Sequence, residues 1–245
     1  MAPIVLTDCS IWIGGHDFTT DLNKVSVNAE AEELNKTTFG LSGWKANAKG
    51  LKNVAASHEG FWQSDTEDAV DVEAFPNLGV ADMPETVSPT GAAGAAAYMF
   101  QNTSLRYSLL GDVGQLTPFT LDAVGSNTQG MKRGLIAVPK GGISATGAIG
   151  SPVNCGAGGA GKFVYAIFHV FSEGTTLELK IESDSAQAFS SAADVTGATL
   201  GPLTTRGGTW MVRADASAIT DTWFRFNATA ITGTFTVAGA IAVSA

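Results

Sequence analysis

The sequence predicts a mainly β protein, built from a β-sandwich or barrel with one short flanking helix and from a C-terminal antiparallel β-sandwich. Charged residues make up only 15% of the 245 residues, whereas soluble domains carry about 25%, and helix bundles and coiled coils need many Glu, Lys and Arg residues. Apolar and polar residues also alternate along several segments, with turn-forming residues between them.

The clearest strand of the first half spans residues 24–34. Val25, Val27, Ala29 and Ala31 fall on one face of it, and polar residues fall on the other. Such a strand packs on one side and meets water on the other. Further strands are expected at 4–13, 53–62, 105–110 and 116–124, and a loop is expected at 88–97.

One helix is expected at about 64–75. Ser64 and Glu67 match a capping box, in which each side chain satisfies a free backbone amide at the start of the helix. Pro76 and Gly79 then end it. The apolar stripe of this helix would consist of Ala69, Val72 and Phe75.

A run rich in Gly, Ala and Ser at 141–161 predicts a flexible linker between a domain at 1–140 and a domain at 162–245. A long loop within a single domain is the alternative. Residues 156–161 match G-x-G-x-x-G, but no strand leads into them and no helix follows, so a dinucleotide site is not expected. Strands of the second half are expected at 162–171, 175–184, 209–214, 222–229 and 234–243.

The formal net charge is −9, which disfavours a protein that neutralises nucleic-acid phosphates. Residues 1–140 hold 16 acids and 9 bases, a net of −7, and the remainder holds 7 acids and 5 bases, a net of −2. The negative charge therefore belongs mostly to the first half.

The sequence contains no motif for an enzyme, a cofactor or a metal. G-x-S-x-G, P-loop and H-E-x-x-H patterns are absent. Cys9 and Cys155 lie too far apart in sequence to suggest a disulfide framework, and the three histidines lack metal-ligand spacing. No apolar run is long enough for a membrane span, and the N-terminus does not resemble a signal peptide.

Aromatic residues gather in the last third of the chain. They could form a platform for a sugar, but aromatics on alternating strands are more typical of a sandwich core. The residues in question are Trp210, Trp223, Phe224 and Phe226.

Residues 21–52 carry an ordered set of short motifs: an alternating strand, then TTFG at 37–40, GW at 43–44 and GLK at 50–52. A further strand and the acidic helix follow. This order resembles the tail tube (major tail) proteins of long-tailed, non-contractile bacteriophages, over roughly residues 1–140. The second half, through residues 162–166, 177–184 and 220–225, resembles a C-terminal β module of phage virion proteins.

The resemblance implies that six copies form a ring whose inner strands join into a barrel, and that rings stack into a tube that conducts DNA without binding it. It implies contacts with terminator, tape measure and distal tail proteins, no membrane and no cofactor. The protein would be assembled in the host cytoplasm and reside in the virion tail. The polar side of strand 24–34 would line the channel, through Ser26, Asn28, Glu30 and Glu32.

The loop at 35–52 would then reach the neighbouring ring. Aromatic residues and lysines together suit a docking arm for an acidic partner, and the residues assigned to it are Lys36, Phe39, Trp44, Lys45, Lys49, Leu51 and Lys52. The alternative is an ordinary loop whose Phe39 and Trp44 pack into their own core. At the level of function, the alternatives are a capsid decoration or tail-tip protein that contacts host surface glycan, and a glycan hydrolase.

Overall fold

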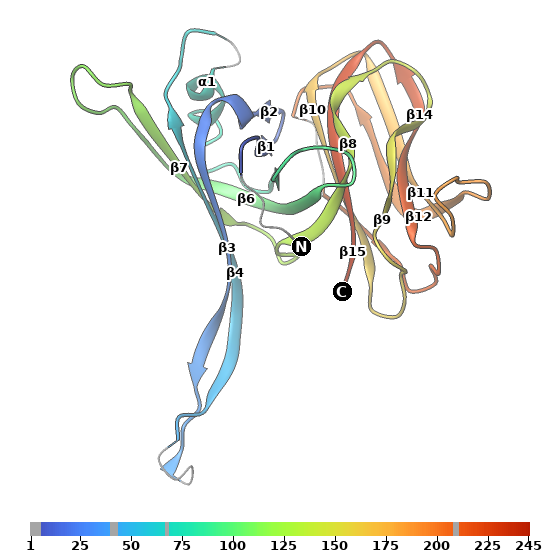
Figure 1. Ribbon diagram of the computed structural model, residues 1–245, viewed down its shortest axis with the longest axis horizontal. Helices are drawn as coiled ribbons and strands as arrows, with labels where there is room; N and C mark the ends of the chain where they lie inside the picture. Colours follow the sequence, from blue (N-terminus) through green and yellow to red (C-terminus); the bar gives the residue numbers. More distant parts are fainter. Residues whose placement is uncertain (1–5, 40–43, 67–68, 208–210) are drawn as a thin grey trace. The chain divides into compact units, whose positions relative to one another are not determined.

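The computed structural model describes residues 6–39, 44–66, 69–207 and 211–245, and the described chain is mainly β (Figure 1). Its contacts divide it into two units. Unit 1 contains the described residues up to Thr20 together with Met83–Gln101 and Lys132–Ala245, and unit 2 contains Asp21–Asp82 and Asn102–Met131. The predicted fold class is confirmed.

Unit 1 is a two-layered sandwich. The strands β12 (Ala193–Leu203), β11 (Thr176–Asp184), β14 (Trp223–Thr232) and β9 (Gly147–Asn154) follow one another in a four-stranded antiparallel sheet. The facing sheet contains β13 (Met211–Asp215), β10 (Phe163–Ser172), β15 (Phe235–Ser244) and β8 (Lys132–Ile143), and continues through β6 (Ala96–Leu109), β5 (Met83–Ser88), β1 (Ser10–Ile13) and β2 (His16–Asp17). A 3-10 turn, η1, covers Phe18–Thr20.

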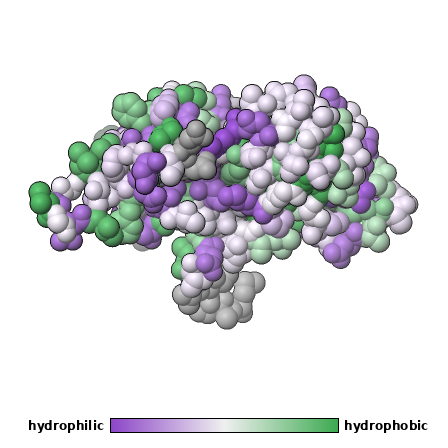
Figure 2. All heavy atoms as spheres, turned by 90° about the horizontal axis from the view of Figure 1, so that it is seen from above, coloured by the Kyte–Doolittle hydropathy of each residue, from purple (hydrophilic) through white to green (hydrophobic). Residues whose placement is uncertain are grey.

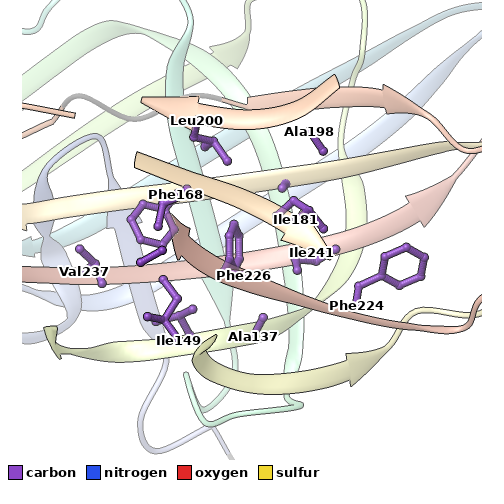
Figure 3. Packing of buried hydrophobic residues seen from close by; sticks show 14 of the residues in the cluster. Ala137, Ile149, Phe168, Ile181, Ala198, Leu200, Phe224, Phe226, Val237 and Ile241 are labelled. Atoms are coloured by element: carbon purple, nitrogen blue, oxygen red, sulfur yellow. The ribbon is translucent and has the colours of Figure 1, made fainter. Parts of the chain in front are cut away.

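The space between these two layers is filled by apolar side chains (Figure 3). The rings of Phe168 and Phe226 lie 5.2 Å apart between their centroids, and both side chains are fully buried. Gly239 makes room for them, because a Cβ at this position would lie 2.8 Å from Phe168 and 2.9 Å from Phe226. Phe224 is buried in the same core, so it and Phe226 form no sugar platform. Trp210 lies outside the described residues.

The linker predicted at 141–161 is not a linker. Gly141 and Gly142 pair with Val237 and Thr236 at the end of β8, and β9 pairs with β14 within the small sheet. Gly150 has a positive φ of 69° and lies where a Cβ would meet the Ala137 carbonyl oxygen, so glycine serves close packing here. The domain boundary predicted near residue 140 is replaced by the discontinuous division into the two units.

Unit 2 is a four-stranded antiparallel sheet with one short helix. Its strands follow the order β3 (Leu22–Asn35), β4 (Asn47–Phe61), β7 (Pro118–Gly125) and the second half of β6. The helix α1 spans only Val70–Ala74, and its N-cap residue, Ala69, makes no side-chain capping bond. The predicted helix therefore starts too early by six residues, and Glu67 of the proposed capping box lies outside the described residues.

The face shown in Figure 2 mixes hydrophilic, intermediate and hydrophobic residues. Among the described residues no helix is long and apolar enough to cross a membrane.

Candidate functional site

The long β3–β4 hairpin is the main feature of unit 2, and it extends well past the end of β7 (Figure 1). Its register runs from Leu22 opposite Gly60 to Asn35 opposite Asn47. Strand β7 pairs with β4 only along residues 55–61. In the described chain, β3 pairs with β4 alone, so the outer edge of β3 is free over 14 residues.

One face of the unit 2 sheet is polar, and its side chains bond to one another across the strands. Ser57 Oγ on β4 donates to Asp122 Oδ1 on β7 over 2.7 Å, and Lys24 Nζ lies 2.5 Å from Glu59 Oε1. Arg106 on β6 also lies 4.0 Å from Asp122. Paired polar groups of this kind suit a surface that faces water rather than a dry core.

The residues predicted to line a channel belong to this polar face. Ser26 stands opposite Ser57, and Glu30 stands opposite Asn53. Asn28 Nδ2 donates to Ser26 Oγ over 3.4 Å. Glu30 and Glu32 are exposed, and no ion pair within the described residues involves either of them. Two uncompensated carboxylates therefore project from the distal end of this face.

The opposite face of β3 is apolar, as predicted, but the chain covers only part of it. Val25 and Val27 are half-buried, whereas Ala29 and Ala31 are exposed. On β4 the buried residues begin only at Val54. The expectation of one packed face thus holds for the proximal half of the hairpin, and both faces of the distal half are open to solvent.

The structure corrects the extent of the predicted loop. Lys49, Leu51 and Lys52 lie on β4, and only Lys36, Phe39, Trp44 and Lys45 belong to the tip. The reason is that pairing continues to Asn35 opposite Asn47, across a bulge between Ala31 and Glu33. The alternative in which the aromatics pack into their own loop is not observed, because Phe39 is fully exposed and the exposed fraction of Trp44 is 80%.

Glu33 contacts several polar side chains close to the tip. Its Oε1 lies 3.6 Å from Lys45 Nζ, and it accepts a hydrogen bond from Asn47 Nδ2. Lys49 stands directly opposite Glu33 in the register. These contacts align the two strands of the distal hairpin, which has neither a third strand nor a covered face to support it.

A second exposed surface, which sequence reasoning missed, surrounds α1. Helix α1 buries Val70 and Ala74 against the unit, whereas Val72 and Phe75 point outward and are exposed by 45% and 65%. The predicted stripe was wrong at these two positions, because a five-residue helix starting at Val70 presents a different face. Together with the following turn, Val72, Phe75, Leu78 and Val80 form what we call the α1 patch.

Helix α1 is fixed to the sheet through Asp71, near its N-terminal end. The amide of Asp71 donates to the carbonyl of Gln63, directly after β4, over 3.1 Å. The hydroxyl of Tyr107 on β6 donates to Asp71 Oδ1 over 3.0 Å, and burial together with this bond raises the pKa of the Tyr107 phenol. The α1 patch is therefore held on a rigid support.

A third exposed apolar segment is the loop between β6 and β7. Leu110, Val113 and Leu116 are largely exposed, and this loop projects at the far left of Figure 1. The sequence could have indicated this exposed loop, because its apolar residues lie in a stretch rich in turn-forming residues.

The groups that usually carry chemistry are buried or paired. His169 Nδ1 bonds to the Gly14 carbonyl oxygen over 2.9 Å and its Nε2 to Thr86 Oγ1 over 2.8 Å, and His58 Nδ1 lies 3.2 Å from the Leu121 carbonyl oxygen. Burial raises the pKa of the Cys155 thiol to about 12. Within the described residues no group of His, Cys, Asp and Glu could hold a metal ion.

No family model and no curated protein matches this sequence. Its fold is similar to a chain in the virion of a native gene transfer agent particle, with a TM-score of 0.42 and 14% identity over 51% of this chain and 95% of that chain. A chain from the tail of an empty gene transfer agent particle with C6 symmetry gives a TM-score of 0.39 at 13% identity, over 51% and 92%. The Dit protein of phage SPP1, described as a hub of the adsorption apparatus in phages infecting Gram-positive bacteria, gives 0.40 at 13% identity over 98% and 100%. All three TM-scores are below 0.5, so the likeness alone assigns no function.

Proposed function

We propose that this protein is a structural component of a bacteriophage tail, and that its copies form the stacked hexameric rings of the tail tube. The observation that carries this proposal is the unit 2 sheet, which combines a free 14-residue edge on β3 with a polar face. A single copy leaves both of these features incomplete, and a closed ring of copies would complete them.

The free edge of β3 favours assembly through strand pairing. An exposed edge strand presents unpaired N–H and C=O groups that pair with another chain unless the protein blocks them. Proline, short strand length and bulges are common blocks; β3 contains no proline, is long, and has bulges only near its two ends, at Leu22–Lys24 and Ala31–Glu33. Closure of several sheets into one barrel removes every such edge.

The polar face would then form the wall of the channel. Its proximal part is neutralised by the Lys24–Glu59 and Arg106–Asp122 pairs, and Ser26 and Asn28 add uncharged polar groups. Glu30 and Glu32 leave a negative field at its distal end, and negative groups repel phosphates. DNA would pass such a wall without binding to it.

The distal hairpin would be the contact between successive rings. Two open faces and the exposed Phe39, Trp44 and Leu51 side chains suit a segment that packs against another copy. Lysines at positions 36, 45, 49 and 52 surround these apolar side chains. Aromatic anchors with a polar rim are typical of protein interfaces.

The remaining assignments follow from this role. The tube ends would contact terminator, tape measure and distal tail proteins, and the protein would reside in the virion tail after assembly in the host cytoplasm. The strands of 162–245 would lie on the tube exterior. The role requires no catalysis, cofactor or membrane.

Electron microscopy of the purified full-length protein tests this proposal. We expect rings of six copies, and tubes of stacked rings at high protein concentration. A protein that stays monomeric at all concentrations, or trimers that bind host cells or turn over host polysaccharide, would point instead to a decoration, tail-tip or hydrolase role.

A further inference from the structure

The α1 patch and the distal end of the hairpin are two exposed apolar surfaces of unit 2 whose surroundings carry opposite net charge. Residues 33–52, at the distal end of the hairpin, hold four lysines, at positions 36, 45, 49 and 52, and one acid, Glu33, which lies 3.6 Å from Lys45. Residues 62–82, around α1, contain no Lys or Arg, and their described acids are Asp65, Asp71, Glu73 and Asp82. The apolar side chains of the distal hairpin therefore lie within a net positive charge, and those of the α1 patch lie within a negative one.

These two surfaces cannot meet within one chain. Strand β4 starts at the tip with Asn47 and ends at Phe61, and the Asp71 amide ties α1 to Gln63 just beyond that end. A rise of about 3.3 Å per residue along β4 separates the tip from α1 by roughly 45 Å. Figure 1 shows them at opposite ends of the hairpin.

We infer that the α1 patch is the docking site for the hairpin tip of a second copy of this chain. Phe39 and Trp44 would seat against Val72, Phe75, Leu78 and Val80, and the tip lysines would face the acids around α1. The inference rests on the proposed tube role and adds to it the surface that receives the arm.

The position of the two surfaces fixes the kind of assembly. A contact between different patches on identical copies is heterologous, and it continues from copy to copy unless a rotation closes it. Because the tip and the patch lie at opposite ends of the hairpin, each docked copy leaves a free tip at one end and a free patch at the other. The contact therefore propagates along the hairpin direction, as stacking of rings requires.

Disulfide cross-linking tests the contact directly. In a background carrying Cys9→Ser and Cys155→Ala, the Phe39→Cys and Phe75→Cys substitutions are combined in one chain and oxidised at a concentration that gives assembly. Because both substitutions replace exposed side chains, the fold should be unaffected. We expect a ladder of covalent multimers on a non-reducing gel, whereas each single variant can give dimers at most.

A charge exchange gives an independent check. Lys36→Glu with Lys52→Glu should abolish the ladder, and so should Asp65→Lys with Glu73→Lys, because like charges would face each other across the contact. Combining all four should restore the ladder. Glu173→Lys, an exposed site in unit 1, is the matched control and should leave the ladder unchanged.

The two levels of the proposal fail in different ways. Parent protein that forms no rings would contradict the tube role, and the ladder can still be scored on that sample. Normal tubes without a ladder, or tip variants that block stacking while the α1 variants do not, would overturn the α1 patch as the acceptor and would show that the tip docks elsewhere.

Discussion

The two units bury their apolar side chains to very different extents. Both hydrophobic clusters belong to unit 1, where Phe168, Phe226 and Phe235 are completely buried. Among the residues that the structure describes, the large exposed apolar side chains, apart from Leu6, all belong to unit 2. Unit 1 thus completes its own core, whereas unit 2 presents surfaces that other copies would complete, and the two should respond differently to the same substitution.

The largest effect is expected from a matched pair of phenylalanines. Phe226→Ala in the unit 1 core should destabilise the protein by about 3–5 kcal/mol, because it removes a buried ring and leaves a cavity. Phe39→Ala at the exposed tip should change stability by less than about 0.5 kcal/mol. Urea unfolding of the unassembled protein measures both, and equal losses at the two sites would contradict the comparison.

Acid should weaken unit 1 through His169. Burial lowers the pKa of His169 from its usual 6.5 to about 4, so the unfolded chain binds this proton more readily than the folded one. The neutral His169 contributes fully to the free energy of unfolding above pH 6.5. This contribution decreases as the pH falls toward 4, by roughly 3 kcal/mol over that range.

Unfolding experiments between pH 4 and 7 on the parent and on His169→Gln measure this effect. The glutamine can still bond to Thr86 or to the Gly14 carbonyl but cannot titrate, so the variant should show a shallower pH dependence. If the unfolding free energies of the parent and the variant depended on pH equally, the titration of His169 would not contribute to the acid sensitivity.

A smaller, assembly-specific effect is expected at Trp44. Trp44→Ala should leave the unfolding free energy of the monomer unchanged, because the side chain is largely exposed, and should shorten or abolish tubes while rings persist. Tube lengths measured by electron microscopy give the result. If the Trp44→Ala variant formed tubes of normal length, Trp44 would not be needed for docking between rings.

The smallest structural effect is expected on the polar face. Replacing Glu30 and Glu32 together by Lys should leave rings and tubes intact, since both side chains are exposed. The reversed charge should attract phosphates and slow the passage of DNA. Phage carrying the double substitution should eject DNA more slowly in vitro, and unchanged ejection kinetics would argue against a channel position for these two residues.

The local pattern of the sequence predicted much of the sheet structure. The alternation at 24–34 and 175–184 identifies β3 and β11 almost to the residue, although the apolar face is covered along β11 and only along the proximal half of β3. The burial of Phe224 and Phe226 also agrees with the sandwich-core interpretation. The strands β8 and β9 were missed because composition alone cannot distinguish the paired glycines Gly141 and Gly142, or the closely packed Gly150, from the glycines of a linker.

The exposed surfaces of unit 2 were predicted less completely, because local sequence patterns do not show which surfaces the rest of the chain covers. The alternation showed which side of β3 is polar, but not that the chain leaves the other side uncovered beyond Val27. The outward face of α1 depends on where the helix begins, and that start is set by the backbone bond from Asp71 to Gln63 rather than by a side-chain cap. Both features depend on tertiary contacts.

The central claim is that the free edge of β3 pairs with another copy, and hydrogen exchange along residues 22–35 tests it most directly. In the unassembled protein, the outward-facing amides of β3 should exchange rapidly, while those bonded to β4 exchange slowly. On assembly, the rapid set should become protected by at least tenfold. Rings or tubes that form while these amides still exchange rapidly would show that β3 is not the strand that joins the copies.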